Sequence, residues 1–373
     1  MPCHAKFLTC LLAGTFLSLP HALAQEPGAL TTTKHVYVLT NQPDKNAVMV
    51  FRRTGSGRLI QRGTFGIRGK GAGAGVDPLQ SQNPLVLNKD GSLLFAVNAG
   101  SNSVAALRVT GDRLRLTSLV PSGGTMPVSV TVSGNLVYVL NAGGVPNISG
   151  FTVDANTGIL TPLANSTQPL PGGATAAPAE VAFVPGESTL VVTEKGTSKI
   201  DTFAVNGDGM AEAGRTFASP KPTPFGFAFA PHHIAVVSDA VKGKPLAAAL
   251  SSYMIRKGGK AEVISAAVPD TQTAACWVAV TRDGAYAYTA NTGSNSISSY
   301  SVSVGGQLTL LNPTAAGANV PTDIALTGNG NFLYVRNGGD GTIAGFAVNP
   351  DGSLRSVSIV GNLPDGAAGL AVR

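Results

Sequence analysis

Cysteine and charge are both scarce in this sequence of 373 residues. Of its three cysteines, Cys3 and Cys10 lie in the first ten residues, which leaves Cys276 alone in the remainder of the chain. A single cysteine excludes an internal disulfide there, so stability has to come from packing. Charged residues make up only 12% of the chain, about half the usual share, which excludes a coiled coil or another long-helix protein.

Long apolar runs are also missing. The longest, Phe7–Leu19, has 13 residues and is too short to cross a bilayer as a helix, so we expect no membrane insertion. It follows Lys6 and precedes Ala22-Leu23-Ala24, a small-x-small cleavage pattern. The sequence therefore predicts a signal peptide over residues 1–24, a short N-terminal segment over 25–34, and a periplasmic or secreted protein.

Glycine and proline are abundant, with 46 and 24 residues, and they punctuate a repeat. The repeated unit spans about 45 residues and contains four short β-type runs separated by turns. Clear copies are MPVSVTVSGNLVYVLNAGGVPNISGFTV from Met126 and PTDIALTGNGNFLYVRNGGDGTIAGFAV from Pro321. Turn dipeptides such as Asp90-Gly91 and Asp283-Gly284 favour tight hairpins. Four strands in a repeat of this length are typical of a β-propeller blade.

Six complete units and one partial unit predict an all-β, seven-bladed β-propeller with four antiparallel strands per blade. The partial unit, 35–66, lacks a first strand, and an orphan strand at 366–372 can supply it. Pairing this C-terminal strand with the N-terminal ones would close the ring and remove an exposed edge. No linker or shift in composition divides residues 35–373, so we expect a single propeller domain over this range, and a monomer.

Several segments resemble one known family: GSLLFAVNAGSNSVAALRV, STLVVTEKGTSKIDTF and ACWVAVTRDGAYAYTANTGSNSI. They are similar to exported bacterial seven-bladed propellers of the lactonase-like group, which is related to propeller-type 6-phosphogluconolactonases and to carboxymuconate-lactonising enzymes. The resemblance covers essentially residues 35–373 and implies lactone chemistry. The relatives carry a histidine near the start of the fourth blade's first strand, whereas the stretch 177–181 has none here. This departure argues against phosphogluconolactonase activity itself.

Propeller geometry assigns two rims. The turns between the first and second strands lie on one rim, here called the tight-turn rim. The loops after the second strands and the connections between blades lie on the opposite rim, the open rim, where binding residues usually sit. Only blades four and five carry acids just after the second strand, Glu194 and Asp239. Because the resemblance implies an acid at Glu194, we predict it as the general base, with Asp239 raising its pKa by like-charge repulsion.

Cations and polar side chains near the same rim complete the predicted site. Lys195 and Lys199 are the candidates to stabilise an oxyanion. Arg336 interrupts a mostly apolar position and is suited to a substrate carboxylate, although an internal ion pair with Asp323 or Asp340 is an alternative. The other predicted substrate-binding residues are Asn98, Asn141, Asn291, Asn337, Glu180, Asp323 and Trp277. For the two carboxyls in that set, hydrogen bonding to loop amides is the alternative.

Two further segments draw attention. The glycine-rich connection 66–82 is the longest in the chain, and we interpret it as a mobile flap over the channel mouth. It lacks the ending and the strand–helix context of a nucleotide-binding loop. The run from Arg52 to Lys70 contains six cations and no acid. We interpret it as a solvated outer strand, because no aromatic stacking platform accompanies it.

Two functional hypotheses stay open. The first is an exported lactonase-type hydrolase, or a lactone-forming enzyme, that acts on a small carboxylated lactone or a sugar-acid-like ligand. The second is a non-catalytic propeller whose rim binds a ligand, a protein or an envelope component. We expect no nucleic-acid partner, no cofactor and no metal, since the histidines offer no third ligand with sensible spacing.

Overall fold

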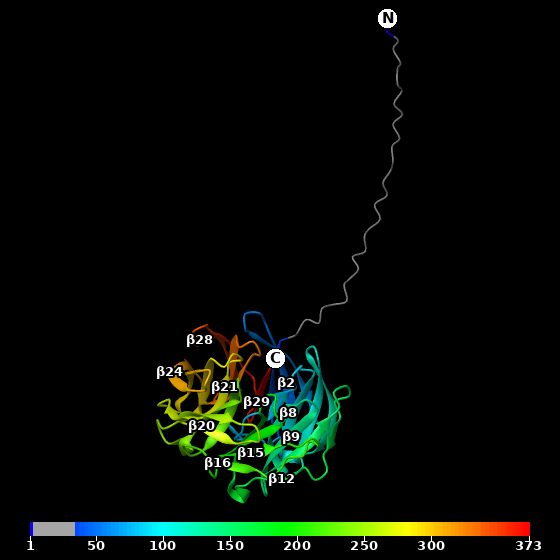
Figure 1. Cartoon of the computed structure of the whole chain (residues 1–373). Helices are drawn as coiled ribbons and strands as arrows, with labels where there is room; N and C mark the ends of the chain where they lie inside the picture. The colour runs from blue at the N-terminus through cyan, green and yellow to red at the C-terminus, as the bar shows by residue number, and fades with distance from the viewer. Residues whose placement is uncertain (3–33) are drawn as a thin grey trace. The chain divides into compact units, whose positions relative to one another are not determined.

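The computed structural model describes residues 34–373 together with Met1 and Pro2, so the predicted signal peptide lies outside the described residues except for its first two. Seven antiparallel sheets are arranged as the blades of a ring (Figure 1). No α-helix occurs among residues 34–373, which contain only four single-turn 3-10 helices: η1 (Ala99–Ser101), η2 (Gly173–Thr175), η3 (Val241–Gly243) and η4 (Thr292–Ser294). The predicted all-β, seven-bladed propeller is confirmed.

The strands of each blade follow in order from the innermost to the outermost. Blade 1 contains β29 (Ala368–Val372), β1 (His35–Leu39), β2 (Ala47–Arg53) and β3 (Leu59–Gly66). Blade 2 contains β4 (Leu85–Leu87), β5 (Leu93–Asn98), β6 (Ser103–Thr110) and β7 (Arg113–Pro121). Blade 3 contains β8 (Thr125–Ser133), β9 (Leu136–Gly143) and β10 (Asn147–Val153), followed by β11 (Leu160–Pro162) and β12 (Gln168–Pro169). Its outermost strand is thus divided into two short pieces that both pair with β10.

The remaining four blades are regular. Blade 4 contains β13 (Pro178–Phe183), β14 (Thr189–Glu194), β15 (Lys199–Ala204) and β16 (Arg215–Ala218). Blade 5 contains β17 (Pro224–Ala230), β18 (Ile234–Asp239), β19 (Ala249–Ile255) and β20 (Ala261–Pro269). Blade 6 contains β21 (Ala275–Val280), β22 (Tyr286–Asn291), β23 (Ser296–Val302) and β24 (Leu308–Gly317). Blade 7 contains β25 (Pro321–Leu326), β26 (Phe332–Asn337), β27 (Thr342–Val348) and β28 (Leu354–Val360).

The C-terminal strand closes the ring as predicted. β29 pairs antiparallel with β1, placing Val372 opposite Val36 and Ala371 opposite Tyr37. The backbone N–H of Leu370 in β29 also donates to Asp323 of blade 7 at 2.7 Å. The first blade is therefore assembled from both ends of the described chain, and no inner strand edge is left unpaired there.

Burial explains the two kinds of strand in the repeat. The second strands, such as β5 and β18, are buried at every position because neighbouring blades cover both of their faces. Their sequences are therefore nearly continuous apolar runs. The outermost strand β3 is exposed at most positions. The core therefore lies between the blades rather than on one side of each sheet.

Six of the seven blade junctions share one hydrogen bond. A hydroxyl in one blade donates to the carbonyl of a turn glycine in the next blade, at distances of 2.6 to 2.9 Å. The pairs are Thr117–Gly158, Tyr138–Gly209, Thr202–Gly259, Ser252–Gly306, Tyr288–Gly352 and Tyr334–Gly57. All six glycines have a positive φ between 75° and 86°, which a residue with a Cβ rarely adopts.

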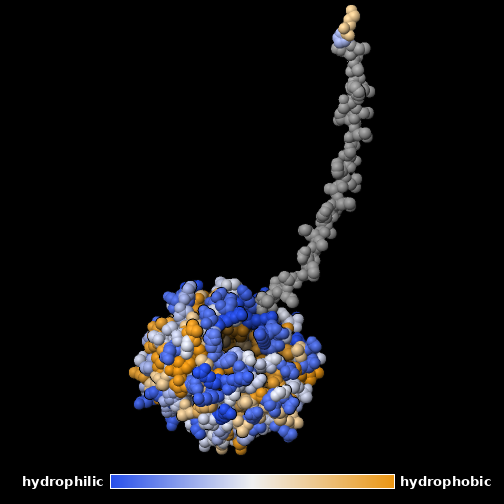
Figure 2. All heavy atoms as spheres, in the orientation of Figure 1, coloured by the Kyte–Doolittle hydropathy of each residue, from blue (hydrophilic) through white to orange (hydrophobic). Residues whose placement is uncertain are grey.

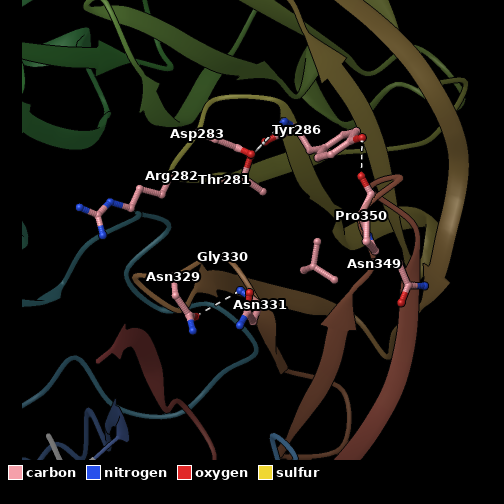
Figure 3. Close-up of a pocket in the computed structure, with 10 residues that line it drawn as sticks. Thr281, Arg282, Asp283, Tyr286, Asn329, Gly330, Asn331, Asn349 and Pro350 are labelled. Carbon is pink, nitrogen blue, oxygen red and sulfur yellow. Dashed lines mark hydrogen bonds between the residues drawn. The ribbon is translucent and has the colours of Figure 1, made fainter.

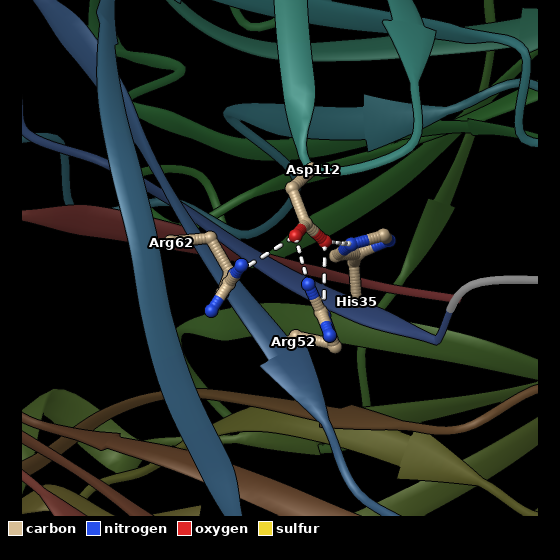
Figure 4. A network of polar contacts seen from close by, with 4 residues as sticks. All are labelled: His35, Arg52, Arg62 and Asp112. Atoms are coloured by element: carbon tan, nitrogen blue, oxygen red, sulfur yellow. Dashed lines mark hydrogen bonds and ion pairs between the residues drawn. The ribbon is translucent and has the colours of Figure 1, made fainter.

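The junction between blades 1 and 2 is different. The hydroxyl of Tyr37 in β1 has no hydrogen-bond partner among the described residues. Asp112, in the β6–β7 turn, instead accepts from His35 Nε2 at 2.7 Å, Arg62 Nε at 2.8 Å and Arg52, which binds both of its oxygens (Figure 4). The Arg52 guanidinium is the main cause that holds the pKa of Asp112 well below its usual range. An ion network replaces the neutral hydrogen bond at this junction.

Candidate functional site

The connection between blades 1 and 2 enters the ring, which Figure 2 shows hollowed near its centre with a hydrophilic edge. Ser81 and Gln82 are buried. Gln82 Nε2 donates to the carbonyls of Val278 (2.9 Å) and Phe227 (3.2 Å), and Gln82 Oε1 accepts from Val278 N at 3.0 Å. Ser81 Oγ donates to Val128 O in blade 3 at 2.7 Å. The interpretation as a flap is wrong for this half of the connection: residues 76–83 form a plug between the inner strands.

Trp277 holds the plug in place from blade 6. Its indole Nε1 donates to Ser81 O at 2.9 Å, and its ring packs edge-on against Phe225 with the ring centroids 5.0 Å apart. Beside it, burial raises the pKa of the Cys276 thiol to about 12, so this thiol stays protonated at neutral pH. Trp277 is almost fully buried and shapes the floor below the open rim, and its contact with a substrate stays a prediction.

Three charged side chains lie near one another where the plug reaches the open rim, and we call Asp77, Lys195 and Arg336 the channel-mouth cluster. The Asp77 carboxylate accepts a hydrogen bond from Gln80 N at 3.0 Å. Burial raises the pKa of Asp77 to about 6, although Lys195 and Arg336 act in the opposite direction. Both Asp77 and Lys195 remain partly exposed, so solvent reaches them.

Lys195 extends from the end of β14 over the plug. Its amine donates to Gln80 O and lies 4.8 Å from the ring centroid of Phe225, a cation–π contact. Burial lowers the pKa of Lys195 to about 8, opposed by the charge of Asp77. The amine is therefore mostly protonated at neutral pH. Lys199 stands apart from this cluster, opposite Glu194 across β14 and β15.

Arg336 is 2% exposed and lies in β26 of blade 7. Its Nη1 donates to Val76 O of the plug at 2.8 Å and to Thr322 Oγ1, while its Nε has no hydrogen-bond partner among the described residues. Burial lowers its pKa, and Asp77 is the first of the carboxyls that oppose this shift.

The predicted alternative, an internal ion pair of Arg336 with Asp323 or Asp340, is not formed as a direct contact within the described chain. Asp323 lies opposite Arg336 in the sheet but accepts from the backbone N–H groups of Ile324 and Leu370. Asp340 accepts from Asn319 and Thr342. The buried guanidinium is therefore compensated at longer range.

Glu180 and Asp323 connect neighbouring inner strands. Glu180 accepts from Phe227 N in blade 5 at 2.6 Å and from Asn83 Nδ2 at the end of the plug at 2.5 Å. Asp323 connects blade 7 to blade 1 in the same way. Burial is the main cause that raises the pKa of both carboxyls, well above its usual value for Glu180 and to about 7 for Asp323. Both carboxyls accept from backbone amides, as in the predicted alternative, but the donors Phe227, Ile324 and Leu370 lie in strands rather than in loops.

Glu194 is fully buried at the end of β14. Its carboxylate accepts from Gly172 N at 2.9 Å and from Thr197 Oγ1. Asp201 lies diagonally across the strand pair, since it is opposite Val192, two residues before Glu194. Burial and the Glu194 carboxyl together raise the pKa of Asp201 to about 8. The acid whose pKa Glu194 raises is thus Asp201, its diagonal neighbour in the strand pair.

Asp239, the second predicted acid, has its own partners in blade 5. It accepts from Ser251 Oγ at 2.5 Å and from Ser219 Oγ at 2.9 Å. Burial raises its pKa to about 7, and the nearby cation that opposes this shift is Lys221. The structure shows no contact between Asp239 and Glu194 among the described residues.

The four predicted asparagines are buried, and the side chain of each forms a hydrogen bond with another residue of the described chain. Asn98 accepts from Asn46 Nδ2 at 3.0 Å, and Asn141 donates to Ser122 O at 3.1 Å. Asn291 donates to Ser298 Oγ at 2.8 Å, and Asn337 donates to Thr342 Oγ1 at 2.9 Å. Their contact with a substrate stays a prediction.

A separate pocket of about 520 Å³ lies on the tight-turn rim between blades 6 and 7 (Figure 3). Its walls are hairpin residues whose polar groups bond one another, such as Thr281 with Asp283 at 2.6 Å and Tyr286 with Pro350 O at 2.9 Å. None of the predicted site residues lines it. Several polar groups of its walls are therefore already engaged.

Asp77 is the site residue that the sequence reasoning missed. It lies in the glycine-rich connection, and the run of glycines directed attention to flexibility rather than to the acid that follows it. The length of this connection was the signal in the sequence that could have identified it. A ring of seven blades leaves a central channel, and a long connection can enter and fill it.

The described residues contain no group of three or more His, Cys, Asp or Glu side chains placed to hold a metal ion. Within the same part of the chain, no helix has the length and apolar character needed to cross a membrane.

The fold and the open-rim site define a propeller of the lactonase type. The family model "Lactonase, 7-bladed beta-propeller" matches residues 31–175 and 180–359, so the chain belongs to this family. No curated protein matches the sequence significantly.

Solved structures share the fold at low sequence identity. A protein from Lactobacillus plantarum has a TM-score of 0.70 and 19% identity, covering 91% of this chain and 99% of its own. A putative 6-phosphogluconolactonase from Bacteroides uniformis has a TM-score of 0.69 and 18% identity, covering 92% and 100%. The periplasmic gluconolactonase of Pseudomonas aeruginosa has a TM-score of 0.68 and 17% identity, covering 91% and 99%.

Proposed function

We propose that this lactonase-like propeller hydrolyses a small carboxylated lactone at the channel-mouth cluster. The observation that carries the proposal is a set of contacts around the Asp77 carboxyl: Lys195 donates to the carbonyl of Gln80, and Arg336 donates to the carbonyl of Val76, the residue before Asp77. Lactone hydrolysis needs a base to activate water and a positive group to stabilise the oxyanion, and it needs no covalent nucleophile. The cluster supplies both kinds of group in one solvent-accessible place.

Each residue then has a defined role. Asp77, with a pKa of about 6, is largely ionised at neutral pH and takes a proton from the attacking water. The new C–O bond forms at the lactone carbonyl while Lys195 stabilises the oxyanion. The ring C–O bond then breaks, and the leaving alkoxide takes the proton back from Asp77. Arg336, with its free Nε, adds the positive charge that favours a substrate carboxylate.

Glu194 remains the base predicted from sequence, with Lys199 and Asp239 as its predicted helpers. Its burial and its bonds to Gly172 and Thr197 keep its carboxylate from solvent in the described conformation. It can act as a base only if the loop 195–198 moves. Variants at the two acids therefore distinguish the two assignments.

The test is hydrolysis of a panel of carboxylated five- and six-membered lactones. With a lactone that the wild type turns over, Asp77→Asn should lower kcat by roughly 10²–10⁴-fold, the cost of removing one general base. The matched control is Asp44→Asn, an exposed acid in the β1–β2 loop on the same rim, which should leave kcat unchanged. Full activity of Asp77→Asn combined with inactive Glu194→Gln would transfer the role of base to Glu194.

The pH profile provides a second readout of the same site. Because Asp77 must be ionised and Lys195 protonated, kcat/KM should form a bell with limbs near pH 6 and pH 8. Asp77→Asn should remove the acidic limb. A profile without that limb in the wild type contradicts the role of Asp77.

A non-catalytic propeller that binds a carboxylate ligand is the second candidate. The unpartnered Nε of the buried Arg336 favours it, since a bound carboxylate would satisfy this donor. If no lactone is turned over but sugar acids bind with saturation and Arg336→Met abolishes that binding, the binding role replaces the catalytic one.

We also propose that the protein is exported to the periplasm or secreted, from the basic start, the apolar run and the Ala-x-Ala pattern before Gln25. The family resemblance to exported propellers supports this location. Intact mass of the product isolated outside the cytoplasm should correspond to a chain that begins at Gln25. A cytoplasmic chain of full length would contradict the proposal.

A further inference from the structure

The net charge of the chain is concentrated in blades 1 and 2. Residues 34–122 contain 12 Lys and Arg against 4 Asp and Glu, a net charge of +8. Residues 123–373 contain 13 Lys and Arg against 15 Asp and Glu, a net charge of −2. Two of the seven blades therefore carry all of the positive excess, and their self-repulsion opposes the compact state.

Four arginines of this region lie at the outer edge of the ring. Arg58 is in the β2–β3 turn, Arg62 is in β3, and Arg113 and Arg115 are in β7; all four are exposed. β3 and β7 are the outermost strands of blades 1 and 2, and they contact one another. We call these four residues the arginine edge.

Internal pairing neutralises little of this charge. Asp112 is bound by Arg52, Arg62 and His35, as Figure 4 shows. Arg58, Arg113 and Arg115 form no ion pair with any other residue between 34 and 373. Three of the four arginines of the edge therefore keep their positive charge available to an external anion, and the fourth, Arg62, is paired with Asp112.

One contact at the edge is unfavourable by itself. Arg115 in β7 lies directly opposite Arg108 in β6, and like charges opposite one another in a sheet are destabilising. Arg108 relieves this by donating to the carbonyls of Ala155 and Asn156 in blade 3, at 2.8 and 2.7 Å. Arg115 has no such partner in the described chain and stays exposed. A bound anion would compensate this pair.

The residue types at the edge indicate the class of anion. Arginine binds phosphate oxygens in a bidentate manner and is suited to phosphate groups. The same two strands expose aliphatic side chains, Ile60 at 49% and Leu119 at 38%. Aliphatic side chains beside cations fit a lipid headgroup region, whereas binding of single-stranded nucleic acid uses aromatic stacking.

We propose that the arginine edge docks the propeller onto a bilayer surface rich in anionic phospholipid. The arginines contact the headgroup phosphates, and Ile60 and Leu119 enter the boundary with the acyl chains. The open-rim site does not take part in this contact, so docking and lactone turnover are independent of one another.

The test is cosedimentation of residues 25–373 with lipid vesicles; this range contains the whole closed ring. One set of vesicles contains phosphatidylcholine alone. The other also contains 30% phosphatidylglycerol, roughly the anionic share that gives a strong surface potential. Binding should require the anionic lipid and should weaken between low and high salt. Each arginine near such a surface contributes roughly fivefold in affinity, so Arg113→Gln with Arg115→Gln should weaken binding by roughly 25-fold.

The matched control is Lys244→Gln with Lys257→Gln, which removes the same charge from exposed positions in blade 5. It should change affinity by less than about twofold, the limit expected for charges remote from the contact. Equal losses in both double variants, or equal binding to phosphatidylcholine alone, would overturn the proposal. A 30-base-pair DNA, a length of roughly three helical turns, serves as the competing ligand at the same salt. If it binds as tightly as the vesicles and the Arg113→Gln, Arg115→Gln variant loses this binding, the membrane proposal is overturned and the arginine edge is assigned to nucleic acid.

Discussion

Charged side chains at the channel mouth and at the junction of blades 1 and 2 differ in whether they form direct ion pairs. At the channel mouth, Asp77, Lys195 and Arg336 influence one another but form no direct ion pair within the described residues, and their pKa values are shifted mainly by burial. At the junction, Asp112 binds its cations directly. Direct pairing lowers the pKa of Asp112, whereas burial raises that of Asp77.

The difference separates a site from a structural contact. A carboxyl that is already bound by two arginines and a histidine has no capacity left for a ligand, and it stabilises the junction where the glycine hydrogen bond is missing. A carboxyl that is partly buried near cations without contacting them retains that capacity, at a cost in folding free energy. The predictions below test this contrast, from the largest expected effect to the smallest.

The pH dependence of stability should follow the buried carboxyls and not Asp112. Asp77, Asp323 and Asp201 have pKa values raised to about 6, 7 and 8, whereas in the unfolded chain they titrate near pH 4. Between these values the unfolded chain releases protons that the folded chain retains. The free energy of unfolding should therefore fall as the pH rises from about 5 to about 8, by about 1.4 kcal/mol per pH unit for each carboxyl that stays protonated only in the folded chain.

Urea unfolding at half-unit pH steps measures this slope. Asp201→Asn is the matched variant, because an amide reproduces the protonated carboxyl and can keep the acceptor for Thr216. It should flatten the slope and stabilise the protein at pH 8. The pairs of Asp112 with Arg52 and Arg62 should contribute equally across this range, since the lowered pKa of Asp112 keeps it ionised. A free energy of unfolding that rises from pH 5 to pH 8 would contradict the contrast between the channel mouth and the junction of blades 1 and 2.

Asp112→Asn should lower the stability by about 1–3 kcal/mol at neutral pH, because it leaves His35, Arg52 and Arg62 without their anion. The measurement is the midpoint of urea unfolding. Asp351→Asn, in the corresponding turn of blade 7, is the control: its carboxylate accepts only from Ser353, so little change is expected. Lactone turnover should be unaffected in both variants. Equal losses of stability would show that the network does not hold the junction.

The smallest expected effects on stability come from replacing two tyrosines by phenylalanine, and the two replacements should differ. Tyr138→Phe removes a hydroxyl that donates to Gly209 O and accepts from Ala211 N, so it should cost about 1–2 kcal/mol. Tyr37→Phe removes a buried hydroxyl that has no partner among residues 34–373, so it should change stability by less than about 0.5 kcal/mol or increase it. If both variants lose the same stability, the different bonding at the junction of blades 1 and 2 has no effect on the free energy of unfolding.

The fold could be predicted almost completely from sequence. Hairpin turns such as Asp283-Gly284, the apolar second strands and the spacing of the repeats identify the blades, because these signals lie within one repeat. The closing strand could also be predicted, since the partial first unit lacks the strand that Ala368–Val372 provides. The divided outer strand of blade 3 was not expected, and nothing in its repeat pattern indicated it.

The site could be predicted only in part. The end of the second strand in blade 4 was identified, and Lys195 and Arg336 do lie beside the channel mouth. The acid paired with Glu194 proved to be Asp201 rather than Asp239, because a strand pair brings residues of opposite strands together across the sheet. The sequence distance between these residues carries no such information.

By itself, the sequence determined the blades and their number, because hairpin registers depend on residues that lie close together in the chain. It also determined the closure of the ring, because the first unit lacks a strand and the C-terminal segment has one to supply. Only the tertiary structure decided what fills the ring and which charges meet there. The plug bonds Val128, Val278 and Arg336, which are 47, 196 and 260 residues away along the chain from their partners. Contacts of that range form only after the blades have assembled, so the identity of Asp77 as a site residue depends on the complete ring.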